Sequence, residues 1–297
     1  LPRVFASICA AGFVAGVHAQ QAYPNRPVRV VVSYPPGGAA DFSARILTVR
    51  LPAVLGQSLV IDNRGGANGI IGCDIVAKSV PDGYTILATS VAFAVNPSMY
   101  KSLPYDSERD FTPITNYANG LGYILVAHPS VQANNIKELI EVAKKQTLRY
   151  SSAGIGNGQH LAGELLNVMA SIRLVHIGYK GGGPAAAAVI AGESQAIFGS
   201  ISATLPQIKA GKVNALGVTS ARRSALLPDY PPIAETVPGF NADPWNGIMA
   251  PRGTPPEVIA KIHGVIAQAL QQTEVREKLA VQGGEASGMS PQAFGKF

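Results

Sequence analysis

Two glycine-rich segments hold the groups most able to bind a ligand. The first, residues 35–41 (PPGGAAD), follows an expected strand and precedes an expected helix. Gly37 and Gly38 allow a sharp turn and a close approach of the backbone to a ligand, and Asp41 can cap the helix. Because a helix N-terminus carries unpaired N–H groups and the positive end of the dipole, this segment predicts an anion-binding site. An ordinary strand-to-helix turn explains the same residues equally well.

The second segment, residues 151–160 (SSAGIGNGQH), repeats this order of strand, glycine-rich turn and helix. Alternate glycines expose its backbone and Ser152 adds a hydroxyl, but the spacing fits neither the dinucleotide-binding motif nor the Walker motif. If the two turns belong to different lobes, they can hold one anion between them. His160, in the first turn of the second helix, is either a ligand contact or a packing residue.

Hydroxyl groups at the ends of other expected strands complete the set of candidates. Ser90 and Ser200 each follow a strand, where the hydroxyl can bond a carboxylate or cap a helix. Tyr34 and Trp245 either line the site or pack in the core. The predicted ligand-binding residues are Tyr34, Pro36, Gly37, Gly38, Ala39, Asp41, Ser90, Ser152, Gly154, Gly156, His160, Gly199 and Ser200.

Catalytic and metal-binding motifs are missing from the sequence. It has no G-x-S-x-G elbow, no H-E-x-x-H pair and no Cys/His cluster with zinc spacing, and we expect no metal and no cofactor. Cys73 lies in an apolar helical stretch, where packing is a better interpretation than nucleophilic chemistry. The protein is therefore expected not to be an enzyme. A secreted hydrolase that uses Ser152 and His160 is the alternative from another class.

The N-terminus predicts export to the periplasm. Arg3 is followed by an apolar run over residues 4–17 and by small residues up to Ala19, the layout of a signal peptide over residues 1–19 that is cleaved near Ala19. A buried N-terminal helix is the alternative. Because Ile8 and not a small residue precedes Cys9, a lipid anchor on that cysteine is not expected.

The charge of the chain favours an anionic partner, but not nucleic acid. The formal net charge of +6 suits anionic partners, but no basic run with interleaved aromatic residues is present, which argues against nucleic acid. We expect a monomer.

Strand and helix patterns alternate along most of the chain. Strands are expected at 28–34, 59–62, 84–89, 123–127, 149–152, 174–177, 196–198, 213–218 and 247–250. Helices are expected at 41–55 (ended or kinked near Leu51 by Pro52), 70–78, 136–145, 159–170, 184–191, 205–209, 256–271 and 274–282. Residues 97–119 are expected to form a connector between two blocks of alternating strands and helices. The pattern predicts an α/β fold with mixed, mostly parallel sheets flanked by helices. Residues 20–122 with 224–297 are expected to form one lobe and residues 123–223 the other.

The order of short motifs resembles a known family over nearly the whole mature chain. The motifs include residues 36–41, Asn63-Arg64, residues 81–85 (PDGYT), residues 103–106 (LPYD), residues 160–164 (HLAGE), residues 179–181 (YKG) and residues 253–256 (GTPP). Together they are similar to the substrate-binding proteins of tripartite tricarboxylate transporters, the Bug family.

The resemblance implies a fold, a ligand class and a partner. The fold is that of a type II periplasmic binding protein, with two lobes that close on the ligand like a flytrap. The ligand is a carboxylate held by the loops that match 35–41 and 152–158, and the bound form is presented to a membrane permease. A ligand-sensing module for a signalling receptor is also compatible with the resemblance.

Two positions depart from the family pattern. Gly199 follows Phe198 where many members carry an Asp, whose carboxylate suits the ammonium group of an amino acid. Its absence favours a plain di- or tricarboxylate or an aromatic acid as the ligand. Pro36 stands where Ala is frequent in the family, and its fixed φ restricts the backbone conformations of the turn.

Overall fold

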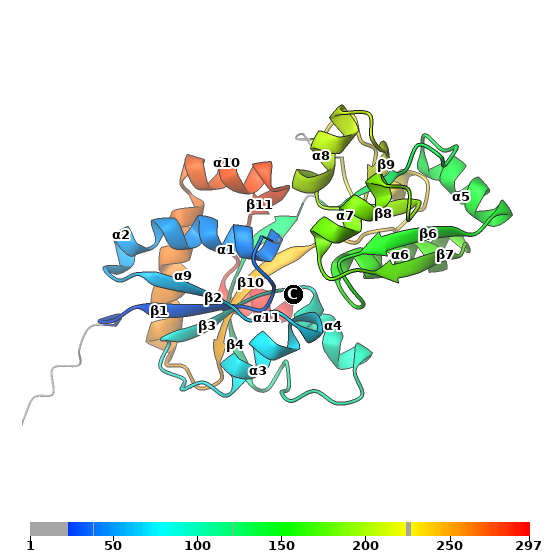
Figure 1. The fold of residues 1–297 in the computed structure, drawn as a ribbon. Coiled ribbons are helices and arrows are strands. Elements are labelled where there is room, and N and C mark those ends of the chain that lie inside the picture. Colours follow the sequence, from blue (N-terminus) through cyan, green and yellow to red (C-terminus); the bar gives the residue numbers. More distant parts are fainter. Residues whose placement is uncertain (1–22, 38, 121, 224–226) are drawn as a thin grey trace, which may run out of the picture.

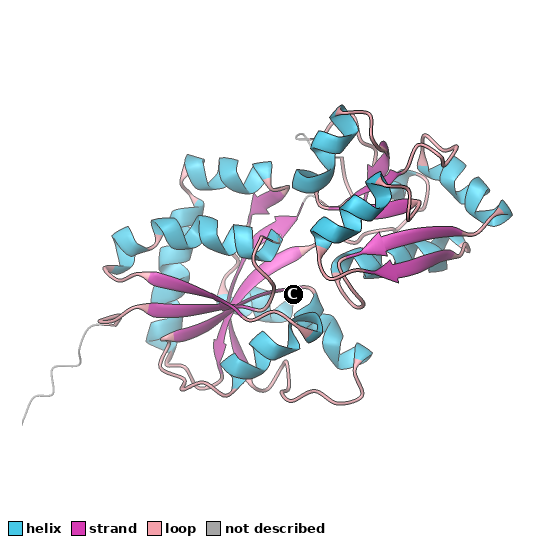
Figure 2. Ribbon diagram, viewed as in Figure 1, coloured by secondary structure: helices cyan, strands magenta, loops and turns pink. Residues whose placement is uncertain are grey.

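The computed structural model describes residues 23–37, 39–120, 122–223 and 227–297 of the chain. It contains two β-sheets, and helices pack on both faces of each (Figures 1 and 2). The predicted two-lobed α/β fold class is therefore confirmed. The predicted signal peptide, residues 1–19, lies outside the described residues.

The first sheet takes its strands from both ends of the described chain. Val30 and Val32 of its strand β1 (Val28–Val32) pack toward helices α1 (Ala39–Arg50) and α9 (Pro256–Leu270), whereas Val31 packs on the other face toward α3 (Ile70–Ala77) and α4 (Ala92–Met99). In spatial order the strands are β11 (Gly284–Ala286), β4 (Phe111–Gly120), β10 (Trp245–Pro251), β3 (Thr85–Ser90), β1 (Val28–Val32) and β2 (Leu59–Asn63). The helices of this lobe are α1 (Ala39–Arg50), α2 (Pro52–Leu55), α3 (Ile70–Ala77), α4 (Ala92–Met99), α9 (Pro256–Leu270), α10 (Thr273–Val281) and α11 (Pro291–Lys296), with a 3-10 turn η1 (Ala67–Gly69).

The second sheet is formed by the middle of the chain. Leu125 and Phe198 lie on the face covered by α5 (Ile136–Lys145) and α6 (Gly158–Ala170). Ile124 and Ile197 lie on the face covered by α7 (Gly182–Ile190) and α8 (Ile201–Lys209). In spatial order the strands are β7 (Leu174–Gly178), β6 (Leu148–Ser152), β8 (Ala196–Gly199), β5 (Ile124–Ala127) and β9 (Asn214–Val218). The helices are α5 (Ile136–Lys145), α6 (Gly158–Ala170), α7 (Gly182–Ile190) and α8 (Ile201–Lys209).

Local sequence signals explain several element boundaries. Pro52 ends the first long helix as predicted: α1 stops at Arg50, and Pro52 begins the short helix α2, where its missing N–H is not needed. Asn135 caps α5, since its side chain accepts a hydrogen bond from the Glu138 N–H at 2.9 Å. Elements fixed by such local contacts are the ones that the sequence predicts to within a residue or two.

Two predictions about the sheets are wrong. The sheets are mixed but not mostly parallel, because β4, β10 and β11 in the first sheet and β5 and β9 in the second form antiparallel pairs. Residues 97–119 are not a connector, since they contain the end of α4 and most of β4. The sequence of β4 (FTPITNYANG) resembles a loop, yet its pairing with β10 and β11 holds it inside the sheet.

The chain passes from one sheet to the other twice. The first crossing lies between Gly120 and Ile124, close to the predicted position. The second follows Phe240, because Leu227, Ile233 and Phe240 pack in the apolar clusters of the second sheet. Trp245, which opens β10, already packs with the first sheet. A boundary at 224 assigns the segment 227–240 to the first lobe, but this segment packs against the second sheet.

Candidate functional site

The turn that follows β1 is held by the side chain of Asp41. Gly37 has φ +80°, a left-handed conformation that favours glycine, and its N–H donates to Asp41 Oδ2 at 2.9 Å. Asn63 Nδ2 donates to Asp41 Oδ1 at 2.9 Å, and Arg45 Nε lies 3.0 Å from both carboxylate oxygens. Only 2% of Asp41 is exposed. Its carboxylate therefore faces its own turn and is already occupied by three donors.

The prediction that Asp41 is the cap residue of the helix is wrong by about one turn. Helix α1 begins at Ala39, so Asp41 lies within the first helical turn and reaches back to the Gly37 N–H. Burial raises the pKa of the Asp41 carboxyl, but the hydrogen bonds from Arg45, Gly37 and Asn63 outweigh burial and keep that pKa below its ordinary value. Pro36 is exposed in the turn, and Gly38 lies outside the described residues.

The predicted residues at the ends of β1 and β3 meet. Tyr34 Oη and Ser90 Oγ share a hydrogen bond of 2.6 Å, and Ser33 Oγ donates to Thr89 Oγ1 at 3.2 Å. Burial raises the pKa of Tyr34 to about 12, and the hydrogen bond with Ser90 offsets only part of this effect. Tyr34 and Ser90 are therefore neutral at pH 7 and offer hydroxyl groups beside the turn.

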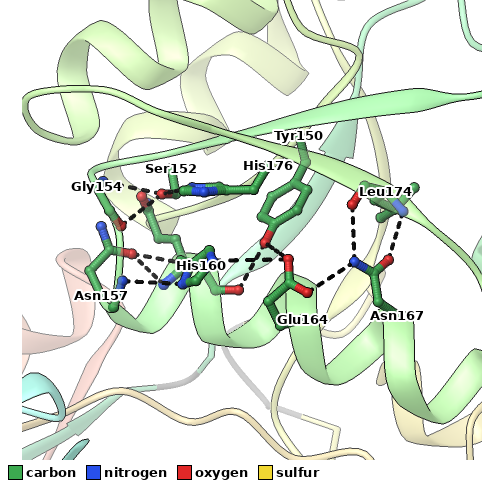
Figure 3. A network of polar contacts seen from close by, with 11 residues as sticks. Tyr150, Ser152, Gly154, Asn157, His160, Glu164, Asn167, Leu174 and His176 are labelled. Atoms are coloured by element: carbon green, nitrogen blue, oxygen red, sulfur yellow. Dashed lines mark hydrogen bonds and ion pairs between the residues drawn. The ribbon is translucent and has the colours of Figure 1, made fainter. Parts of the chain in front are cut away.

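The second glycine-rich turn is held by a network that contains a histidine the sequence reasoning missed (Figure 3). Ser152 Oγ donates to the Gly154 carbonyl at 3.0 Å, accepts from the Gly154 N–H at 3.1 Å and lies 2.6 Å from His176 Nε2. The partner of Ser152 is thus His176 on β7 and not His160. Because Ser152 is fully buried, the pairing of Ser152 with His160 in a hydrolase has no support in this geometry.

His160 and Asn157 fix the start of α6. His160 Nδ1 accepts from the Gly156 N–H at 3.1 Å, so this histidine supports the turn from behind. Asn157 Oδ1 accepts from the N–H groups of Gln159 and His160 at 2.9 and 3.0 Å, which makes Asn157 the N-cap. An Asn at the start of a predicted helix is a capping signal that could have been read from the sequence.

The two lobes touch at Gly156. A Cβ atom at this glycine would lie 2.7 Å from Asn68 Nδ2 and 3.6 Å from Met99 Cε, both in the first lobe. Asn68 in turn donates to Asn96 Oδ1 at 2.9 Å. Sequence reasoning did not identify Asn68 or Asn96 as site residues. The second turn is therefore in contact with the first lobe, and only glycine fits at the contact point.

The end of β8 is packed more tightly than the prediction assumed. Gly199 is buried, and a Cβ atom there would lie 2.0 Å from Thr204 Cγ2 of α8. Ser200 is the N-cap residue of α8, and its carbonyl accepts from Thr204 Oγ1 at 2.8 Å. The close approach of β8 and α8 explains why glycine stands at 199. Trp245 packs in the apolar core, which was the simpler of its two interpretations.

The arrangement suits binding better than catalysis. Two strand–glycine turn–helix units present helix N-termini, hydroxyl groups and backbone N–H groups, all of which can donate to an anion. Within residues 23–297, as far as they are described, no group of three or more His, Cys, Asp or Glu side chains could hold a metal ion. Cys73 is buried, and burial raises the pKa of its thiol to about 12, so it is a packing residue, as predicted.

The fold and the paired turns define a two-lobed solute-binding protein of the periplasmic binding protein class. Comparison with known families makes this specific: the family described as "Tripartite tricarboxylate transporter family receptor" (TctC) matches residues 43–297. The chain belongs to this family, as the motif resemblance predicted. It is a family of receptors and not of enzymes, which agrees with the missing catalytic motifs.

Individual relatives are similar over almost the full length. The chain is 37% identical to the protein BugT of Bordetella pertussis, over 93% of this chain and 86% of BugT. It is 33% identical to Rpa4515 of R. palustris, whose structure was solved with adipate, with a TM-score of 0.86 over 92% of this chain and 93% of that one. MatC of Rhodopseudomonas palustris, with bound malate, is 29% identical with a TM-score of 0.83 over 92% and 95% of the two chains.

Proposed function

We propose that this protein captures a small carboxylate between its two lobes and delivers it to the membrane subunits of a tripartite transporter. The contact of Asn68 in one lobe with the Gly156 turn of the other carries the proposal. Gly65, three residues before Asn68, lies against Pro35, since a Cβ atom at Gly65 would be 2.7 Å from Pro35 Cδ, and this supports a site that includes both turns. The adipate and malate bound to similar proteins support a carboxylate as the ligand class.

The binding site includes both turns and the hydroxyl groups beside them. Its proposed residues in the first lobe are Tyr34, Pro36, Gly37, Gly38, Ala39 and Ser90, and those in the second are Ser152, Gly154, Gly156, Gly199 and Ser200. Ser152 acts in the site as a support, as do Asp41 and His160, since their polar atoms already bond to the turns themselves. Backbone donors and neutral hydroxyls favour a plain di- or tricarboxylate or an aromatic acid over an amino acid, whose ammonium group requires an acidic partner.

Closure of the lobes is the proposed mechanism of capture. Packing favours lobes of residues 23–120 with 245–297 and of residues 122–242, joined by the crossings near 121 and 243. Closure excludes water, and hydrogen bonds to a charged carboxylate are stronger in a drier site.

A periplasmic location and a monomeric state complete the proposal. Of the helices that the structure describes, none is long and apolar enough to cross a membrane. The signal-peptide pattern and the receptor family support export, and the transporter's membrane subunits are the expected partners.

Calorimetric titration with adipate, malate, citrate and benzoate tests the proposed function. We expect a dissociation constant in the micromolar range or below for at least one of them, about −8 kcal/mol or more favourable. A sugar and an amino acid serve as controls. Binding of a control compound with no binding of any carboxylate would refute the proposal.

A further inference from the structure

Two imidazole rings lie directly behind the second glycine-rich turn (Figure 3). The ring centroids of His160 and His176 are 4.1 Å apart, and each ring contacts a different part of the turn. His160 Nδ1 accepts the Gly156 N–H at 3.1 Å, and His176 Nε2 lies 2.6 Å from Ser152 Oγ. Together the rings fix both ends of the segment from Ser152 to Gly156.

The contact with Gly156 determines the protonation of His160. A backbone N–H can donate only to a nitrogen that carries no hydrogen, so Nδ1 of His160 must be unprotonated. Ser152 Oγ and His176 Nε2 share a hydrogen bond of 2.6 Å in which either atom can be the donor. Both contacts are satisfied by neutral imidazoles. A proton on His160 Nδ1 would place two N–H groups against each other and break the bond to Gly156.

The surroundings of the rings oppose a positive charge on either of them. Burial lowers the pKa of His160, and Glu164 on the same helix, with its carboxylate 4.0 Å from Nε2, offsets only part of this effect. Burial and then the neighbouring His160 lower the pKa of His176 to about 4. From β6, Tyr150 faces the pair and donates to Glu164 Oε1 at 2.7 Å, which occupies part of that carboxylate.

We infer that His160, with His176 packed against its ring, is a positioning residue that holds the Ser152–Gly156 turn in its binding conformation only while the His160 ring is uncharged. This inference rests on the proposed function, since it assigns the turn to carboxylate binding. Acidification then protonates His160, releases the Gly156 N–H and weakens ligand binding, although a positive charge near an anion would by itself strengthen binding. The sign of the pH effect therefore separates positioning from simple charge attraction.

Variants that retain the hydrogen bonds but cannot titrate test the inference. His160→Asn places an amide oxygen near the position of Nδ1, and His176→Gln places an amide near the position of Nε2. His128→Gln is the matched control, because His128 bonds to Ser130 outside the turn. Affinity for adipate or malate, whichever binds more tightly, is measured by calorimetry from pH 7.5 to pH 3.5. Ionisation of the ligand affects all proteins equally and cancels in the ratio of their affinities.

We expect the wild type and His128→Gln to lose at least about threefold more affinity over this range than the double variant. Equal losses in all three proteins, or tighter binding by the wild type at low pH, would overturn the inference.

An experiment without ligand keeps the two proposals apart. In the ligand-free protein, the NMR amide signal of Gly156 should shift along the same titration curve as the imidazole signals of His160 or His176. A Gly156 signal that ignores this titration overturns the inference even if carboxylates bind. Absence of carboxylate binding refutes the proposed function, and the NMR titration still decides whether the imidazoles hold the turn.

Discussion

Replacing Asp41 with alanine removes the acceptor that holds the first turn. The buried carboxylate accepts from Gly37, Asn63 and Arg45. A hydrogen bond to a charged group contributes about 1.5–3 kcal/mol, whereas an ion pair with a half-exposed partner such as Arg45 contributes only about 0.2–1 kcal/mol. Asn63 keeps its bond to the Tyr34 carbonyl and the exposed Gly37 can bond to water, which reduces the total. We expect Asp41→Ala to lower the free energy of unfolding by about 2–3 kcal/mol.

Urea unfolding and calorimetry of the same samples measure both consequences of this change. Because the turn loses the hydrogen bonds that hold it, the affinity for the carboxylate ligand should also fall at least about tenfold. Asp41→Asn is the matched control. It retains the shape of the side chain and one amide oxygen, so it should lower the free energy of unfolding and the affinity less than Asp41→Ala does. A loss of binding with no change in stability would show that Asp41 contacts the ligand directly, contrary to the geometry.

Three further changes test the packing around the site. Gly156→Ala should weaken carboxylate binding at least about tenfold in calorimetry. The control Gly211→Ala should leave binding unchanged, because Gly211 shares the left-handed backbone but its added Cβ would meet nothing within 4 Å. Equal binding by both variants would exclude the contact between lobes. Gly199→Asp should destabilise the protein by about 3 kcal/mol or more in urea because its Cβ would overlap Thr204, and an unchanged midpoint would contradict this packing. The Cys73 thiol should not react with Ellman's reagent at pH 8 until the protein unfolds, and rapid reaction of the native protein would contradict its burial.

Local patterns made most of the fold predictable. Helix α5 was expected at 136–145 and occupies Ile136–Lys145, because its cap and its apolar periodicity lie within the segment itself. Strand β4 was missed for the opposite reason. Its Pro and Asn residues argue against a strand, and only pairing with β10, far along the chain, stabilises it. Parallel or antiparallel pairing depends in the same way on partners that periodicity does not reveal.

The site shows the same division between local and distant contacts. Both turns were predictable, because glycine, hydroxyl and capping residues follow their strands directly. The pairing of Ser152 with His176 was not, since it depends on the register that places β7 beside β6. The sequence predicts that the polar side chains of both turns contact the ligand, but two of them bond to the turns themselves. Asp41 accepts from the Gly37 N–H, and His160 accepts from the Gly156 N–H.

The two lobes hold their turns with groups that titrate in different ranges. The pKa of Asp41 lies below its ordinary value, so its stabilising effect is complete above about pH 4 and is lost only as the pH falls further. The pKa of His176 also lies below its ordinary value of about 6.5, so its contribution is complete above that pH and declines as the pH falls toward 4. Acidification should therefore lower the free energy of unfolding through His176 at a higher pH than through Asp41. Because a ligand clamped between the lobes needs both turns, the imidazole pair and not the carboxylate sets the acid limit of binding.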